Sequence, residues 1–244
     1  DEVKQQYDAA SKRLLFIDYD GTLMGFNEDP QAVFPDEEVL DILTKLAADE
    51  KNCVVINSGR DRDTLQKWLG HLDVEMAAEH GVWMKENGQW HLNPNVVAGW
   101  KPKIRELLEN LVARTPGSFI EEKDYSLAWH YRSIDRELGQ KRVREFRDML
   151  SYLIQNQDLQ VLEGNKVVEI KNAGVNKGKA TAHWVQKDSY SFILGIGDDT
   201  TDEDIFNNLP EDGVSIKVGP ERTAARYNLS GVPEVRKMFK GLIG

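Results

Sequence analysis

The 244-residue chain lacks several features that would assign it to large classes of protein. It has one cysteine, Cys53, so no disulfide can form within the chain, and this content fits a reducing compartment such as the cytoplasm. Basic residues are in the minority, 31 against 41 acidic, and the formal net charge of −10 disfavours unspecific nucleic-acid binding. No apolar run approaches the length of a membrane span, and no secretory signal is visible, which argues against a membrane partner.

Motifs for nucleotide binding and for two forms of nucleophilic hydrolysis are also missing. The chain has neither a G-x-x-x-x-G-K-[ST] loop nor a G-x-G-x-x-G turn, so nucleotide binding is unsupported. No G-x-S-x-G elbow surrounds Ser58, which makes this serine better suited to binding phosphate than to attacking a substrate. Cys53 and Arg60 are separated by six residues, one more than cysteine phosphatases require, and the apolar run around Cys53 predicts an inert core thiol.

What the chain does have is a repeating order of buried strand, turn and helix. Hydrophobic residues make up 40% of the sequence, enough for a sizeable core. Continuous apolar runs predict strands at 14–17, 53–57, 76–82, 191–197 and 214–218. Apolar residues at helical spacing predict helices over 36–47, 61–69, 177–186 and from Glu221. This order predicts an α/β fold whose core is a Rossmann-like parallel sheet with right-handed crossovers.

A different pattern interrupts this order between residues 98 and 174. Helices are predicted over 100–114 and 134–154, each followed by two strand-like runs, around Lys123-Asp124 and around Gly164-Asn165. Such a unit is α+β, and it is inserted into the α/β frame. We therefore expect a core domain of residues 1–97 and 175–244, and an inserted domain of residues 98–174.

Polar side chains follow three strands of the predicted parallel sheet. Asp18 and Asp20 follow the first strand, Ser58 follows the next, and an acidic run starts with Asp198 and Asp199. The carboxyl ends of parallel strands share one edge, so these groups and the nearby Lys177 should gather there. Clustered carboxylates repel unless a cation is bound, and hard oxygen donors suit Mg²⁺. The acidic run could instead be a solvated helix start, whereas a calcium EF-hand is excluded because Glu203 replaces its required glycine.

As a set, these residues resemble the four motifs of the haloacid dehalogenase superfamily. The motifs are Asp18-x-Asp20-Gly21-Thr22, Ser58, Lys177 and Gly197-Asp198-Asp199-x-x-Asp202, and the insertion lies between the second and third, as does the cap of the sugar-phosphatase branch. Within the insertion, E-E-K at 121–123, H-Y-R at 130–132 and E-G-N-K-V-V-E-I at 163–170 resemble the trehalose-6-phosphate phosphatases. Sucrose and mannosylglycerate phosphatases share the scaffold. The resemblance covers essentially the whole chain.

The resemblance implies a role for each matching residue. Asp18 would be the nucleophile that forms an aspartyl-phosphate, and Asp20 the general acid and base, kept protonated by crowding among carboxylates. Mg²⁺ would be held by Asp18, the Asp20 carbonyl and Asp198. The phosphate would be bound by Ser58, Lys177 and Arg132. The metal or Lys177 would be supported by Asp199 and Asp202. The sugar would be bound by Glu121, Lys123, Lys166, Glu169 and Arg60.

The implied function is a Mg²⁺-dependent phosphatase that hydrolyses trehalose 6-phosphate to trehalose and phosphate. Three alternatives stay open: another sugar-phosphate phosphatase of the sucrose or mannosylglycerate type, a catalytically silent regulatory domain, and a phosphotransferase similar to β-phosphoglucomutase. Fungal and plant phosphatases of this kind are often fused behind a synthase domain. Because the chain begins with Asp1 rather than Met, we expect a fragment whose partner is a trehalose-6-phosphate synthase domain or subunit.

Overall fold

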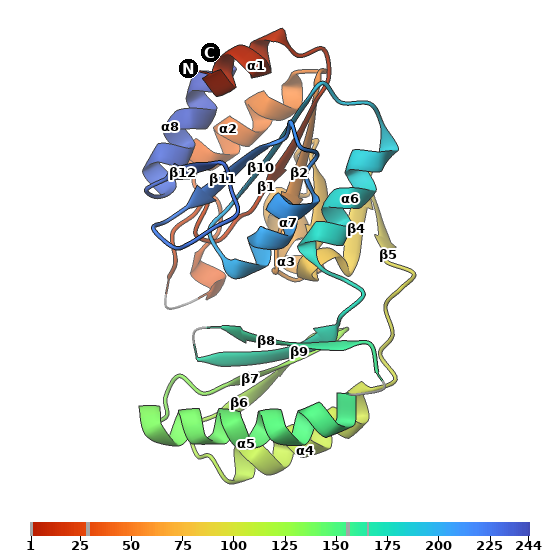
Figure 1. The fold of residues 1–244 in the computed structure, drawn as a ribbon, viewed down its shortest axis with the longest axis vertical. Helices are drawn as coiled ribbons and strands as arrows, with labels where there is room; N and C mark the ends of the chain where they lie inside the picture. Colours follow the sequence, from red (N-terminus) through yellow and green to blue (C-terminus); the bar gives the residue numbers. More distant parts are fainter. Residues whose placement is uncertain (1, 28–29, 155–156, 165) are drawn as a thin grey trace. The chain divides into compact units, whose positions relative to one another are not determined.

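The computed structural model describes residues 2–27, 30–154, 157–164 and 166–244, and the chain divides into two compact units (Figure 1). Unit 1 comprises Asp1–Asn93 and Asn176–Gly244, and unit 2 comprises Pro94–Val175. Unit 2 is therefore a single continuous segment inserted into unit 1. Its limits lie at 94 and 175, where the sequence predicts 98 and 174.

An eight-stranded sheet forms the centre of unit 1, in the order β12-β11-β10-β1-β2-β3-β4-β5. Its parallel strands are β12 (Tyr227–Leu229), β11 (Val214–Val218), β10 (Phe192–Gly197), β1 (Arg13–Ile17), β2 (Asn52–Asn57) and β3 (Glu75–Ala78). An antiparallel hairpin, β4 (Trp83–Glu86) and β5 (Gln89–Leu92), extends the sheet beyond β3. Every residue of β1 and β10 is buried, as expected for central strands covered on both faces. The predicted parallel-sheet core is confirmed.

Helices cover both faces of this sheet (Figure 1). One face packs against α1 (Glu2–Ala9), α2 (Glu37–Ala48), α3 (Arg62–Leu69) and α8 (Val232–Ile243). The other face packs against α6 (Lys177–Lys187) and α7 (Glu203–Asn208). Helix starts are fixed by side chains that accept a backbone N–H: Asp36 accepts from Val39 in α2, Asp61 from Thr64 in α3, and Asn176 from Lys179 in α6.

Unit 2 is a four-stranded antiparallel sheet with two helices against one face. The strands β6 (Phe119–Glu122), β7 (Ser126–His130), β8 (Leu159–Gly164) and β9 (Val167–Asn172) are ordered β6-β7-β9-β8. The helices α4 (Lys101–Ala113) and α5 (Arg136–Ile154) bury Leu108 and Phe146 against alternate sheet residues. Asn165, in the predicted turn between β8 and β9, lies outside the described residues.

Two sequence predictions about unit 1 are wrong. The strand expected over 76–82 ends at Ala78, because the next three residues, Glu79–Gly81, form a short 3-10 turn. The helix expected from Glu221 does not form. Instead the chain enters β12 at Tyr227, and the last helix, α8, begins at Val232.

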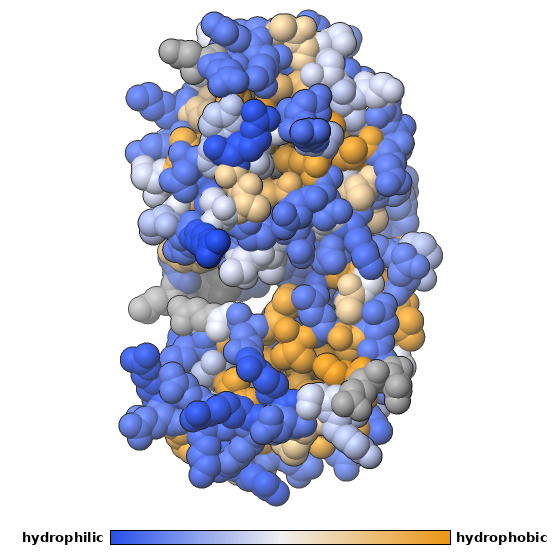
Figure 2. Space-filling view, in the orientation of Figure 1, coloured by the Kyte–Doolittle hydropathy of each residue, from blue (hydrophilic) through white to orange (hydrophobic). Residues whose placement is uncertain are grey.

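The face drawn in Figure 2 is predominantly hydrophilic, in keeping with the 30% of charged residues in the sequence. Figure 2 shows polar residues over most of the visible face, with hydrophobic residues gathered in smaller areas on both units. Within the described part of the chain, no helix combines the length and the apolar character that crossing a membrane requires.

Candidate active site

Asp18 stands directly after β1 and is held from three sides. Its backbone N–H donates to the Ile196 carbonyl at 3.0 Å, which ties it to the end of β10. Its carboxylate accepts from Lys177 Nζ at 2.6 Å and from Thr22 Oγ1 at 2.9 Å. Burial, reinforced by the charge of Asp202, raises the pKa of Asp18 well above its ordinary value, while Lys177 opposes this rise. Asp18 is therefore buried, 4% exposed, and its side chain is oriented by hydrogen bonds.

Lys177 is the cation at the centre of the site. It is the first residue of α6, and its Nζ donates to Asp18 at 2.6 Å and to Asp202 at 2.7 Å. The Asn57 side chain at the end of β2 donates to the Lys177 carbonyl at 3.1 Å, which fixes the start of the helix. Burial alone would lower the pKa of Lys177, but the two carboxylates outweigh it and raise that pKa. Lys177 is therefore held as an ammonium group.

Asp18, Asp198 and Asp202 form an acidic cluster in which each residue offers one carboxylate oxygen, and these three oxygens lie within 4.8 Å of one another. Gly21 makes the approach possible, because its φ is +80° and a Cβ there would lie 2.0 Å from an Asp198 oxygen. Burial first, and the charge of Asp202 second, raise the pKa of Asp198 to about 6. Three hard oxygen donors whose mutual repulsion a cation would relieve fit a divalent metal ion.

The raised pKa of Asp198 predicts how the stability of the metal-free protein changes with pH. The pKa of Asp198 is 3.8 in the unfolded chain and about 6 in the folded chain, so folding favours its protonated form. We expect the contribution of this group to folding stability to be complete below pH 3.8 and to be lost between pH 3.8 and pH 6 as the pH rises. Melting temperatures measured in EDTA at several pH values test this. Asp198→Asn should make the melting temperature fall less steeply with rising pH, whereas the exposed control Asp212→Asn should leave that fall unchanged. Equal slopes for all three proteins would contradict the prediction.

Asp20 is placed differently from the sequence expectation. Its carboxylate accepts from Arg60 Nε at 2.8 Å and also from Arg60 Nη2, and the guanidinium lies 5.0 Å from the centre of the Trp68 ring. The Asp20 side chain therefore has a bidentate cationic partner that the sequence did not predict, and its crowding by carboxylates stays a prediction. Arg60, expected at the sugar, forms an ion pair with Asp20.

Ser58 is buried, and it directly follows β2 and is hydrogen-bonded to the neighbouring strand β3. Its backbone N–H donates to the Ala77 carbonyl at 2.9 Å, and its Oγ accepts from the Arg60 N–H at 3.1 Å. The turn after β3 completes this enclosure, because the His80 N–H donates to the Ser58 carbonyl at 3.0 Å. Sequence reasoning missed the turn by extending the strand to Val82. The two polar residues before Gly81, Glu79 and His80, were the feature of the sequence that could have predicted this turn.

Asp199 and Asp202 have separate roles at the end of β10. The exposed Asp199 accepts the Thr200 N–H at 2.6 Å. Its side chain also accepts the Asp202 N–H, and the Asp202 side chain accepts the Asp199 N–H at 3.0 Å, so the two form a capping box. Asp202 is fully buried and also pairs with Lys177. Asp202 therefore belongs to the acidic cluster, whereas the described contacts of the Asp199 side chain are those of a cap.

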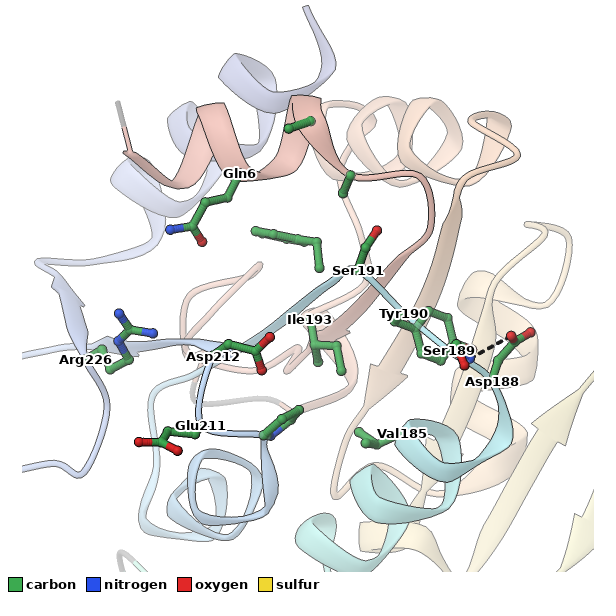
Figure 3. Close-up of a pocket in the computed structure, with 14 residues that line it drawn as sticks. Gln6, Val185, Asp188, Ser189, Tyr190, Ser191, Ile193, Glu211, Asp212 and Arg226 are labelled. Atoms are coloured by element: carbon green, nitrogen blue, oxygen red, sulfur yellow. Dashed lines mark hydrogen bonds between the residues drawn. The ribbon is translucent and has the colours of Figure 1, made fainter.

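Cys53 and a large surface pocket both lie apart from these residues. Burial raises the pKa of the Cys53 thiol to about 11, which keeps it protonated and unreactive. A pocket of about 1090 Å³ at the amino-terminal end of β10 is lined by Asp188, Tyr190, Asp212 and Arg226 among others (Figure 3). None of the predicted site residues is among the described residues that line it.

In unit 2, strand register places predicted sugar-binding residues on one face. Glu121 pairs with Ala128, and Ala128 pairs with Glu169, so all three lie on the face away from the buried Trp129. Glu169 accepts from Ser126 Oγ at 2.7 Å and lies 3.5 Å from Lys123 Nζ. This face therefore carries a set of charged groups held by their neighbours.

The same face extends to the end of β7. His130 is hydrogen-bonded to Glu121 at 2.7 Å and stacks on Phe119, with ring centres 4.7 Å apart. Lys166, in the turn between β8 and β9, has a left-handed backbone with φ at 64°. Its Nζ lies 5.6 Å from the ring of Tyr131, which stacks on Trp129 of the opposite, helix-covered face. Arg132 follows β7 with an exposed side chain. The Phe119–His130 pair could not be predicted from the sequence, because stacking depends on the register between strands.

Two of the solved structures that are similar in fold show how specific the likeness is. The C-terminal domain of the trehalose-6-phosphate phosphatase of C. albicans is 31% identical, with a TM-score of 0.89, and the match covers 100% of this chain and 96% of that one. A haloacid dehalogenase-like hydrolase from B. subtilis is 13% identical with a TM-score of 0.62, covering 93% and 98% of the two chains. The second likeness concerns the fold alone. The predicted haloacid dehalogenase-like fold is confirmed.

Sequence comparisons are more specific. A bifunctional trehalose-6-phosphate synthase/phosphatase of Thermoproteus tenax is 37% identical over 99% of this chain and 33% of its own length. The chain spans a third or less of the length of the first curated relatives that it matches. The family model described as Trehalose-phosphatase matches residues 16–233. The chain therefore belongs to the trehalose-phosphatase family.

Proposed function

We propose that this chain hydrolyses trehalose 6-phosphate to trehalose and phosphate through an aspartyl-phosphate intermediate. The observation that carries the proposal is the environment of Asp18, a buried carboxylate oriented by Lys177 and Thr22 beside Asp198. Membership of the trehalose-phosphatase family supports the reaction, and the names of the relatives support the substrate. A panel of sugar phosphates, with phosphate release as the readout, tests the substrate. A preference for sucrose 6-phosphate would overturn that part of the proposal.

In the proposed reaction, a carboxylate oxygen of Asp18 attacks phosphorus while the bond from phosphorus to the sugar oxygen breaks. The leaving sugar oxygen takes a proton from Asp20, which must first leave its contact with Arg60 and be protonated. Water then attacks the phosphorus of the aspartyl-phosphate and gives its proton to Asp20, so phosphate leaves and Asp18 is regenerated. Dividing a very slow hydrolysis into two steps lowers each barrier. Ser58 and Lys177 bind the phosphoryl oxygens.

We propose Mg²⁺ as the metal, held by Asp18, Asp198 and the backbone carbonyl of Asp20, with Asp202 close by. When bound, the ion supplies positive charge that offsets the repulsion between the nucleophile and the substrate phosphate. The Lys177 ammonium group supplies a second positive charge beside the same carboxylate of Asp18, at 2.6 Å.

Removal of metal should abolish the activity reversibly. We expect EDTA to stop phosphate release from trehalose 6-phosphate and an excess of MgCl₂ to restore it, because the acidic cluster then regains its cation. CaCl₂ is the matched control. Calcium takes more ligands at longer distances, so it should restore little turnover. Undiminished turnover after exhaustive chelation contradicts the proposal.

We also propose that unit 2 is the sugar-recognising cap, with contributions from Glu121, Lys123, Lys166 and Glu169. Hydroxyl-rich ligands need groups that donate and accept hydrogen bonds, and these side chains supply both. Arg132 would bind the phosphate through its guanidinium. Register supports this proposal only by placing Glu121 and Glu169 on one face of the sheet.

Glu169→Gln should weaken sugar binding more than it slows the chemical step. A hydrogen bond to a charged group contributes about 1.5–3 kcal/mol, so we expect KM for trehalose 6-phosphate to rise by about 10- to 100-fold with kcat changed far less. Steady-state kinetics measure both constants. Glu163→Gln is the control, because Glu163 pairs with Arg147 on α5. A KM equal to that of the unsubstituted protein excludes Glu169 from sugar binding.

The remaining proposals concern partners and location. A trehalose-6-phosphate synthase domain or subunit is the proposed partner, since the name of the Thermoproteus relative includes a synthase. The cytoplasm is the proposed location, supported by the single free cysteine, Cys53. Co-purification with a synthase and localisation by microscopy test these two proposals.

A further inference from the structure

We propose that His80, at the centre of the left-handed turn Glu79–Gly81, is a positioning residue for Ser58 and Arg60. The inference rests on the proposed function, because it concerns how the phosphate-binding hydroxyl and the partner of Asp20 are kept in place. The described contacts of His80 lead to the backbone of residues 58–60. His80 would therefore act through these residues rather than on the substrate.

The turn has an uncommon backbone. Glu79, His80 and Gly81 follow one another with φ values of 48°, 59° and 101°, and only the last is a glycine. Left-handed conformations in non-glycine residues are uncommon and cost roughly 1–3 kcal/mol each, so they persist only where surrounding contacts hold them. Two such residues in succession mark a segment whose shape is maintained by what it contacts.

Those contacts lie on the Ser58–Arg60 loop. The Glu79 N–H donates to the Arg60 carbonyl at 2.8 Å, and the His80 N–H donates to the Ser58 carbonyl at 3.0 Å. The left-handed turn directs two successive N–H groups at the two carbonyls that flank Gly59. The Ser58 N–H donates in turn to the Ala77 carbonyl, at 2.9 Å. The loop is therefore fixed at both ends by the segment that follows β3.

The imidazole ring of His80 holds the middle of the loop. A Cβ built on Gly59 would lie 2.8 Å from both Cε1 and Nε2 of His80, a separation that real Cβ atoms essentially never show. The ring therefore packs directly on the Gly59 backbone, and glycine is the residue that permits it. Gly59 does not have a left-handed φ, so the ring and not the backbone conformation is what excludes a side chain there.

Both neighbours of Gly59 have roles in the proposed reaction. Ser58 Oγ accepts from the Arg60 N–H at 3.1 Å, and the Arg60 side chain holds Asp20 at 2.8 Å. A shift of the loop would move the Ser58 hydroxyl, which is proposed to bind phosphate, together with Arg60, the partner of Asp20. Misplacement by about 1 Å can cost on the order of 100-fold in rate, so a ring that only supports the loop can have a large kinetic effect.

A double-mutant cycle between Gly59→Ala and His80→Asn tests the proposal. Asparagine tolerates a left-handed backbone and keeps the N–H, so it removes only the ring. We expect His80→Asn to lower kcat by about 10-fold and Gly59→Ala by about 100-fold, with KM changed less. In the His80→Asn background, where the ring is gone, Gly59→Ala should cost no more than about threefold. Equal cost in both backgrounds, or unchanged kcat in His80→Asn, overturns the proposal.

Inhibition or binding by inorganic phosphate provides the second readout. We expect phosphate affinity to fall in both single variants and the same non-additivity to appear, while melting temperatures stay within a few degrees of the unsubstituted protein. If Gly59→Ala does not fold, His80→Asn alone decides through kcat and phosphate affinity. If the unsubstituted protein hydrolyses no sugar phosphate, the proposed function fails, and calorimetric phosphate binding by the four proteins still tests the role of His80.

Discussion

Asp18→Asn is expected to lower phosphate release from trehalose 6-phosphate by at least about 10⁴-fold, because an amide cannot replace a carboxylate as the attacking group. The loss should lie in kcat. The phosphate-binding groups Ser58 and Lys177 remain in place, and Lys177 keeps Asp202 as a partner at 2.7 Å. Single-turnover measurements should detect no phosphorylated protein after acid quench, whereas the unsubstituted protein should show one.

The fold should survive this substitution, which separates a catalytic from a structural effect. Burial raises the pKa of Asp18, so its ionised form is unfavourable inside the metal-free protein. A neutral amide of the same shape removes that cost, and we expect a melting temperature at pH 8 equal to or above that of the unsubstituted protein. Asp212→Asn, an exposed change at the surface pocket of Figure 3, is the matched control and should keep full activity. Appreciable turnover by Asp18→Asn would exclude Asp18 as the nucleophile.

The parts of the site that were predictable from sequence are those encoded locally. An apolar run followed at once by a carboxylate identified the ends of β1 and β10, and a parallel sheet then required Asp18 and Asp198 to lie on the same edge. The structure brings these two carboxylates together with Asp202. Lys177, the first residue of the helix predicted over 177–186, was likewise expected near this edge.

The features that sequence reasoning missed depend on contacts between distant segments. The spacing of Asp18 and Asp20 does not determine that the second side chain turns to Arg60, which is 40 residues away. The segment after Glu221 has helix-forming residues, yet Glu203 accepts the Ala224 N–H at 2.8 Å and Ser215 accepts the Arg226 N–H at 2.9 Å. These bonds hold the chain extended toward β12, so tertiary contacts override local propensity.

Lys177→Met should combine the loss of activity with the largest loss of stability, because it leaves the buried carboxylates of Asp18 and Asp202 without their shared cation. Breaking a buried ion pair costs about 3–5 kcal/mol, which in a chain of this size lowers the melting temperature by about 6–20 °C. We expect this loss at pH 8 in EDTA. Thermal unfolding followed by circular dichroism measures it.

Magnesium should distinguish the electrostatic role of Lys177 from its role toward the substrate. A bound divalent ion restores positive charge beside the same carboxylates, so MgCl₂ should recover part of the melting temperature of Lys177→Met. It should not recover turnover, because the ammonium group that binds a phosphoryl oxygen is still missing. Lys179→Met is the control, since Lys179 lies two residues along α6 with an exposed side chain and should change neither quantity. If Lys177→Met has the same melting temperature as the unsubstituted protein, the acidic cluster does not depend on Lys177 for its charge balance.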